Sequence, residues 1–405
     1  MARSAPGVLA APAAARATLG ALRSVGLADK AVRALVSKEP RALAAAAADV
    51  LAVRALLCDD AGDVRLPEKL FAPLLKRAPW LLHRGAGADG GDRARWAGSA
   101  RFLRHDLALP VDRMVAAYPE VLDRSPAELR AVCDALSRDA RLQDDEVPKV
   151  AAAFPLVFGL DPATRIKPAV MFMHRELGAF PPPRRAAPLR PRSRSRPALP
   201  TPPPSPPGID RDDVARVLRA FPSLLGLEPE THFMPVVNFL RDTGVLNIGR
   251  FVQRYPPVLA MDVATNLRPK MEWLLGTEGA PFRGRDNGPL GLKLQLYELL
   301  RFPALLSYPI DAVVAPRVAF LLSRGASDAL LRGQIKLVVT PGDEDFAKAV
   351  AGVQVNEYRA FKTQYVEEDV GAAPATTALP LSAPSAHYCC CYCCCYYYYL
   401  LPTTY

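Results

Sequence analysis

A pair of prolines at one fixed spacing recurs along this chain and limits what it can fold into more than any other feature. The first proline of each pair follows an aromatic residue, and the second lies 13 residues further on, inside an apolar run. The four clearest pairs are Phe154-Pro155 with Pro168, Phe221-Pro222 with Pro235, Tyr255-Pro256 with Pro269, and Phe302-Pro303 with Pro316. Such a pattern indicates a solenoid, whose repeats bury their apolar faces against their neighbours. We therefore expect function to lie on a surface rather than in a pocket.

Residues 214–245 predict the structure of one repeat. Apolar residues at helical spacing indicate a first helix that ends at Phe221, because proline disfavours helix in the residue before it. A short apolar connector follows, and Pro235 is expected in the first turn of a second helix, where a missing N–H is tolerated. A glycine then ends the second helix. The stop glycines of the four clearest repeats are Gly178, Gly244, Gly279 and Gly325.

Weaker copies extend the pattern toward the N-terminus. They lie around Pro40, Pro79 and Pro119, which gives about seven repeats over residues 27–330. The chain after them, with aromatic residues between positions 343 and 366, predicts a C-terminal helical cap at residues 331–370. Residues 179–208 and the Gly/Arg-rich loop at residues 279–291 exceed the repeat length, and we interpret both as insertions between repeats.

The repeat resembles that of the mitochondrial transcription termination factor (mTERF) family. The shared text is Arg-x-Phe-Pro-x-Leu-Leu, a proline 13 residues on, then Phe-Leu or Trp-Leu and a glycine, and it is clearest over about residues 110–330. The resemblance implies an all-α helical-repeat solenoid of right-handed type, a crescent of about seven mTERF-like helix–connector–helix units. It also implies nucleic-acid binding in a mitochondrion or chloroplast. Members of the family act in organellar transcription, including its termination, or in rRNA maturation, intron splicing and ribosome assembly.

The net charge of +10 is concentrated outside the repeats. Residues 1–28 hold three arginines and residues 179–208 hold six, with no acidic residue in either segment. Any basic face of the nearly neutral repeats must therefore arise by segregation of charge to one side. Candidate nucleic-acid-binding residues cluster at the ends of first helices and beside the second-helix prolines. They are Arg216, Arg219, Arg250, Arg254 and Arg301 in the first group, and Lys167, Arg268, Lys270 and Arg317 in the second.

Two functions are compatible with these residues. The cations could contact nucleic-acid phosphates, or they could be solvated residues that balance the helix dipole on a solenoid whose concave face binds a helix or peptide of another protein. The charge of the repeats does not distinguish these two alternatives, whereas the family resemblance favours nucleic-acid binding. The partner would be double-stranded DNA or structured RNA of an organelle, with double-stranded DNA favoured, and we expect a monomer.

Signals of catalysis, metal binding or membrane insertion are poor. Residues 85–90 match the pattern GxGxxG, but no hydrophobic strand precedes them, so we interpret them as a loop between repeats. The five histidines are scattered and have no other metal ligand at a suitable spacing. No run of 18 uncharged apolar residues predicts a membrane span. We therefore predict neither an enzyme nor a cofactor, and we interpret the aromatic residues before the first prolines as core residues rather than base-stacking platforms.

The remaining segments differ from the repeats in composition. Residues 1–26 have the alanine, arginine and serine content of an organellar transit peptide, although an ordinary disordered start is the alternative. The Pro/Arg-rich insert at residues 179–208 is predicted to be disordered. We favour an inert linker or a retained intron over the third interpretation, a basic arm that binds phosphates. The low-complexity tail at residues 371–405 holds six cysteines in no known zinc spacing. We interpret this tail as a mispredicted exon rather than as an acylated or metal-binding segment.

Overall fold

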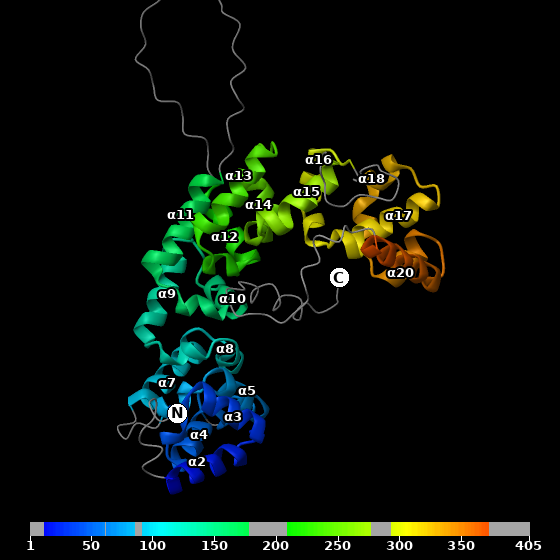
Figure 1. The fold of residues 1–405 in the computed structure, drawn as a ribbon. Helices are drawn as coiled ribbons and strands as arrows, with labels where there is room; N and C mark the ends of the chain where they lie inside the picture. The colour runs from blue at the N-terminus through cyan, green and yellow to red at the C-terminus, as the bar shows by residue number, and fades with distance from the viewer. Residues whose placement is uncertain (1–11, 61, 86–90, 178–208, 277–292, 372–405) are drawn as a thin grey trace, which may run out of the picture. The chain divides into compact units, whose positions relative to one another are not determined.

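The computed structural model describes residues 12–60, 62–85, 91–177, 209–276 and 293–371, and these residues form helices and no β-strand (Figure 1). The all-α prediction is therefore confirmed. The chain divides into two compact units. Unit 1 comprises Met1–Arg175 and Ile209–Pro229, and unit 2 comprises Glu176–Gly208 and Glu230–Tyr405. Each repeat is named below by its first proline, so that the Pro222 repeat contains Pro222.

The described residues contain the seven predicted repeats. Their first helices are α3 (Asp29–Lys38), α5 (Glu68–Arg77), α8 (Val111–Ala117), α10 (Glu146–Ala153), α12 (Arg211–Ala220), α14 (Ile248–Arg254) and α16 (Leu296–Arg301). Their second helices are α4 (Ala47–Cys58), α7 (Gly91–Arg101), α9 (Pro126–Arg138), α11 (Lys167–Glu176), α13 (Met234–Asp242), α15 (Arg268–Leu275) and α17 (Ala315–Ser323). Helix α2 (Pro12–Ser24) precedes them, α6 (Trp80–Gly85) lies inside the Pro79 repeat, and α18 (Asp328–Val339), α19 (Asp343–Asp345) and α20 (Val355–Gly371) follow.

The first helix of each clear repeat ends at the aromatic residue before the proline, as predicted. Phe154, Phe221, Tyr255 and Phe302 have φ between −134° and −147° and ψ between 67° and 77°, outside the helical region. The proline then begins a short 3₁₀-helix, which is the predicted connector. These connectors are η4 (Pro155–Gly159), η6 (Pro222–Gly226), η8 (Pro256–Ala260) and η10 (Pro303–Ser307).

A π-helical turn precedes the second proline of each clear repeat, which the sequence did not predict. These turns are η5 (Pro162–Ile166), η7 (Pro229–Phe233), η9 (Val263–Leu267) and η11 (Ile310–Val314). In three of them the residue next to the turn donates its N–H five residues back, as Lys167 does to the carbonyl of Pro162. A proline inside a helix loses one hydrogen bond and clashes with the carbonyl four residues earlier, and the wider turn accommodates it. The second helix therefore starts about one turn earlier than Pro235 led us to expect.

Left-handed glycines follow three of the described second helices, α13, α15 and α17. Gly244 and Gly325 have φ of 89° and 83° and take the predicted stop positions. In the Pro256 repeat the left-handed glycine is Gly276, with φ of 69°, rather than Gly279. Gly279 and Gly178 lie outside the described residues. Four residues other than glycine are also left-handed, and each lies three to five residues before the next first helix. They are Arg65, Ala108, Arg141 and Lys293, with φ between 46° and 53°.

Each such turn is anchored by the apolar residue that follows it. Leu109 donates its N–H to the carbonyl of Leu103 at 2.9 Å and is buried. Leu294 donates to the carbonyl of Leu274 at 2.8 Å, so a backbone hydrogen bond also joins the described residues on either side of positions 277–292. The next first helix therefore begins from a fixed position in both cases.

Aromatic residues before the prolines pack between repeats. Phe154, Phe221 and Tyr255 are buried, and Phe302 is half-buried. A Cβ atom added at Gly226 would lie 2.9 Å from Cζ of Phe154, and one added at Gly159 would clash with the Tyr118 ring. The aromatic ring of one repeat therefore rests on the 3₁₀-helix of the next, as the core interpretation predicted.

The segments outside the repeats are partly described. Residues 12–24, within the predicted transit peptide, form helix α2, where Thr18 is buried and donates its hydroxyl to the carbonyl of Ala45 at 2.6 Å. Cleavage after position 26 would remove this packed helix, and cleavage stays a prediction. The predicted C-terminal cap is helical over residues 328–339 and 355–371. The predicted insert at residues 179–208, the glycine loop at 86–90 and the tail from residue 372 lie outside the described residues.

Candidate nucleic-acid interface

The strongest basic cluster among the predicted site residues lies on α14 and α16 in unit 2. Arg250 and Arg254 are exposed on α14, four residues apart on one face, and this helix has no acidic residue. Arg254 donates from Nη1 to the carbonyl of Leu300 at 2.8 Å, which brings it to the end of α16 beside exposed Arg301. We call Arg250, Arg254 and Arg301 the α14–α16 cluster.

The cations of this cluster are not neutralised by carboxylates within the described part of the chain. The side chains of Arg250 and Arg301 make no ion pair there, and Arg254 bonds only to a neutral carbonyl. Arg250 is the third residue of α14, where the helix dipole favours an anion. Balance of the dipole therefore explains Arg254 and Arg301 at helix ends, but not Arg250.

Arg216 and Arg219 on α12 are exposed but paired. Nη1 of Arg216 lies 3.0 Å from Oδ1 of Asp213 on the same helix, and Arg219 pairs with Glu146 of α10. Exposed pairs of this kind contribute about 0–1 kcal/mol to stability, and they cancel the local charge. Arg216 and Arg250 both lie six residues before a repeat proline, and they differ in that an aspartate stands three residues before Arg216 only.

Arg317 was wrongly predicted to be a surface cation. Its side chain is 3% exposed in α17, where Nη1 donates to the carbonyls of Val338 and Val339 at 3.0 and 3.1 Å. Its Nη2 lies 2.8 Å from Oδ1 of Asp343, and the guanidinium lies 4.9 Å from the ring centre of Phe346. The guanidinium therefore holds the C-terminal cap against α17 and cannot reach a phosphate.

Lys270 also serves a contact between repeats. It is half-buried, and Nζ donates to the carbonyl of Leu306 in η10 at 2.7 Å. Burial lowers the pKa of Lys270, opposed by the charge of Asp311. This lysine is therefore less suited to phosphate contact than the sequence suggested.

Lys167 and Arg268 remain exposed but separate from the α14–α16 cluster. Lys167 begins α11 and makes no ion pair with another described residue. Nη1 of Arg268 lies 4.0 Å from Oε1 of Glu272, and its guanidinium lies 4.8 Å from the ring centre of Phe239. No hydrogen bond or ion pair recorded in the described ranges joins either residue to the cluster.

Basic side chains that bridge repeats form a group that sequence reasoning missed. Arg124 donates to the carbonyl of Gly159 at 3.3 Å, and Arg165 donates to that of Gly226 at 3.1 Å, just as Lys270 donates to Leu306. The acceptors lie at the ends of 3₁₀-helices, where backbone dipoles favour a cation. The donors occupy no common position relative to the prolines, so the sequence alone does not separate them from free surface cations.

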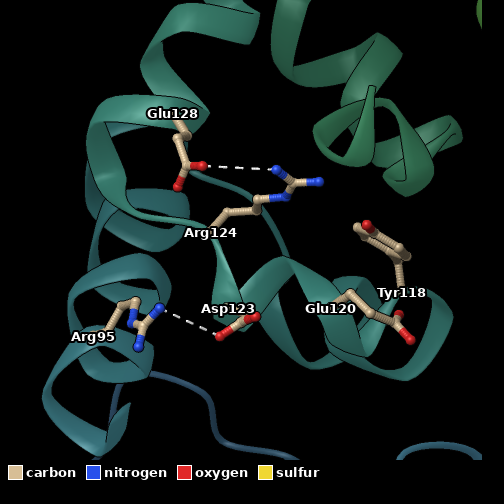
Figure 2. A pocket seen from close by; sticks show the side chains of 6 residues that line it. All are labelled: Arg95, Tyr118, Glu120, Asp123, Arg124 and Glu128. Atoms are coloured by element: carbon tan, nitrogen blue, oxygen red, sulfur yellow. Dashed lines mark ion pairs between the residues drawn. The ribbon is translucent and has the colours of Figure 1, made fainter. Parts of the chain in front are cut away.

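Figure 2 shows a hollow in unit 1, lined by charges of both signs. Nη1 of Arg95 lies 3.5 Å from Oδ1 of Asp123, and Nη1 of Arg124 lies 3.7 Å from Oε1 of Glu128. Asp123 also pairs with Arg84 at 2.6 Å. The contacts of Asp123 join α6, α7 and η3 (Pro119–Asp123) by ion pairs, and the pair of Arg124 with Glu128 on α9 is separate from them. Within the described ranges no cluster of three or more potential metal ligands is found.

The fold and the α14–α16 cluster define an all-α helical-repeat protein with a cationic surface on its first helices. The mTERF family model matches residues 206–347, which contain the Pro222, Pro256 and Pro303 repeats and the whole cluster. The resemblance seen in the sequence is therefore confirmed over residues 206–347, and this segment is similar to the mTERF repeat region. No curated protein matches the chain. In the part of the chain that the structure describes, no helix is both long and apolar enough to span a membrane.

Proposed function

We propose that this chain is an organellar nucleic-acid-binding protein that regulates transcription, including its termination, by contacting double-stranded DNA through Arg250, Arg254 and Arg301. Arginine side chains that neutralise phosphates release counterions, and this release supplies most of the affinity for nucleic acid. The observation that carries the proposal is the group of cations without carboxylate partners on two joined helices of the mTERF segment. A role in organellar RNA metabolism would use the same contacts.

The preference for double-stranded DNA and the organellar location rest on the family match and on the sequence. Residues 1–26 have the composition of a transit peptide for a mitochondrion or chloroplast. A protein-interaction solenoid without nucleic-acid binding is the second candidate. The arginine at position 250 favours the first, because neither helix capping nor ion pairing accounts for it.

The double variant R250Q/R301Q tests the proposal in the full-length chain. Binding to duplex DNA, single-stranded DNA and RNA is measured by fluorescence anisotropy across a salt series. Loss of two phosphate contacts should reduce the slope of log K against log salt by up to about 1.8 on duplex DNA, at about 0.9 per contact. The variant should also weaken binding at every salt concentration.

The matched control is R216Q, because Arg216 has the same position in its repeat but pairs with Asp213. We expect R216Q to change the slope by less than either single variant, R250Q or R301Q. An equal effect of R216Q and R250Q would show that binding follows total charge rather than the α14–α16 cluster. Absence of nucleic-acid binding by the wild-type chain at low salt would support the protein-interaction alternative.

A further inference from the structure

We propose that α3 and α5 in unit 1 form a second surface that contacts the phosphates of a nucleic acid, separate from the α14–α16 cluster. This inference rests on the proposed function and extends it to a part of the chain that the mTERF model does not match. The surface consists of exposed cations on the two helices and the connector after α3. We call it the α3–α5 surface: Lys30, Arg33, Lys38, Arg41, Lys69, Lys76 and Arg77.

The cations of α3 and α5 lie in matching positions on neighbouring helices. Lys30 and Lys69 each precede their repeat proline by ten residues, and Lys38 and Arg77 each precede it by two. Nζ of Lys38 lies 3.4 Å from the carbonyl oxygen of Arg77, so the ends of the two helices lie side by side. The cations therefore follow one another in the same order along α3 and along α5, from Lys30 and Lys69 to Lys38 and Arg77.

Carboxylates do not neutralise this surface. Three acidic residues occur in residues 29–41 and 68–77, and two of them pair with arginines outside the surface: Asp29 with Arg23 at 2.7 Å, and Glu68 with Arg54. The third, Glu39, is half-buried. Lys30, Arg33, Arg41, Lys69 and Lys76 form no ion pair with any residue of the described ranges. Seven like charges at this density repel one another, and a polyanionic ligand would relieve that repulsion.

The α3–α5 surface and the α14–α16 cluster share a position that the middle repeats lack. The residue two before the proline is basic in the first two repeats and the last two, and alanine in the three between. These residues are Lys38 and Arg77, then Ala117, Ala153 and Ala220, then Arg254 and Arg301. Arg77 donates to the carbonyl of Ala117 at 2.8 Å, as Arg254 does to that of Leu300. A hydrogen bond from one repeat to a carbonyl of the next needs only one cation at each contact. Such bonds therefore do not explain why the surface also carries Lys30, Arg33, Lys69 and Lys76.

The chemistry of the surface favours nucleic acid over a lipid membrane. A helix that lies on a membrane buries large apolar side chains among the lipids. The exposed large apolar residues of the described chain include none on α3 or α5. Contact with phosphates needs no exposed apolar side chain, and the exposed charged side chains on α3 and α5 that lack an ion-pair partner among the described residues are cations.

The test compares three variants of the full-length chain. The fourfold variant K30Q/R33Q/K69Q/K76Q removes charges from the surface but keeps Lys38 and Arg77, which bridge repeats. The variant R113Q/R138Q/R175Q/K348Q removes four exposed cations elsewhere and gives the same net charge. R250Q/R301Q removes the α14–α16 cluster. Duplex DNA binding is measured across a salt series, and binding to phosphatidylcholine vesicles with and without phosphatidylserine is measured in parallel.

We expect the fourfold surface variant to reduce the salt slope on duplex DNA by up to about 3.6, at about 0.9 for each of four phosphate contacts, and the charge-matched variant to leave it unchanged. If the two fourfold variants behave alike while R250Q/R301Q still weakens binding, the α3–α5 proposal is wrong and the proposed function stands. If the surface variant loses only vesicle binding, the surface binds lipid and the proposal is also wrong. No DNA binding by the wild-type chain would overturn both.

Discussion

Replacing Arg317 with alanine should destabilise unit 2 more than any other single change among the predicted site residues. The substitution removes a 3%-exposed guanidinium that donates to two carbonyls at the end of α18 and pairs with Asp343. Breaking a buried ion pair by removing one partner costs about 3–5 kcal/mol. Asp343 is about one-third exposed and keeps a second partner, Lys362 at 2.9 Å, so the lower end of that range applies. We therefore expect a loss of about 3 kcal/mol.

The loss should come from unsatisfied backbone carbonyls as well as from lost packing. R317M restores most of the side-chain volume but offers no donor to Val338 and Val339, so it should still lose about 2 kcal/mol. R301A removes an exposed arginine without an ion-pair partner in the described ranges and should stay within about 0.5 kcal/mol of wild type. Guanidinium denaturation followed by far-UV circular dichroism measures these differences. Full recovery in R317M, or a loss below 1 kcal/mol in R317A, would refute the reasoning.

The ion pair between Arg317 and Asp343 also predicts how the stability of unit 2 changes at low pH. Burial raises the pKa of Asp343, but hydrogen bonds and charges from Arg317 and Lys362 outweigh it and hold the pKa below the ordinary value of about 3.8. A carboxyl whose pKa is depressed by folding stabilises the protein above its unfolded pKa, and that stability is lost as the pH falls through the folded value. Wild-type unit 2 should therefore lose stability below about pH 4, and R317A should lose less over the same range.

Two further pairs of substitutions test the packing of the repeats and the turns between them. G226A places a methyl group 2.9 Å from Cζ of Phe154 and should lower the free energy of unfolding by about 1–3 kcal/mol. The control G98A, where the nearest atom to the added methyl group lies at 3.8 Å, should not lower it. Equal melting temperatures for the two variants would contradict the contact between the Phe154 ring and Gly226. A108G relieves a left-handed residue with φ of 51° and should raise stability by up to about 1 kcal/mol. The control A131G, at an exposed alanine in the interior of α9, should lower stability by about the same amount. Thermal denaturation of the pair measures the sign, and a loss in both variants would show that Ala108 is not strained.

The helix ends could be predicted from the sequence because the effect of proline is local. The residue before each first proline leaves the helix whatever packs against it, and Phe221 and Tyr255 do so at nearly the same φ and ψ. The π turn was missed because the proline 13 residues on is compatible with either a helix start or a widened helix. The length of the helix N-terminal to that proline decides between them.

The role of each cation could not be predicted, because it depends on residues far away in the sequence. Arg317 directly follows a second-helix proline, as Lys270 does, so the sequence does not distinguish the two. Arg317 is buried because its guanidinium donates to the carbonyls of Val338 and Val339, 21 and 22 residues further along the chain. The α3–α5 surface was missed for the opposite reason. Asp29 and Glu68 lie on the same helices and lower the net charge of these segments in the sequence, but they pair with Arg23 and Arg54 on other elements.

A backbone hydrogen bond joins the described residues on either side of positions 277–292, which makes this place in the chain suitable for grafting. Leu294 bonds to Leu274 at 2.8 Å, so the chain on both sides of the 16 intervening residues is held together at this point. The free-energy cost of closing a loop grows only with the logarithm of its length, at about 0.6 kcal/mol for each doubling. A fluorescent reporter or peptide tag inserted here should therefore leave the stacking of the neighbouring repeats intact, which makes unit 2 a scaffold that can carry a foreign segment without redesign of its core.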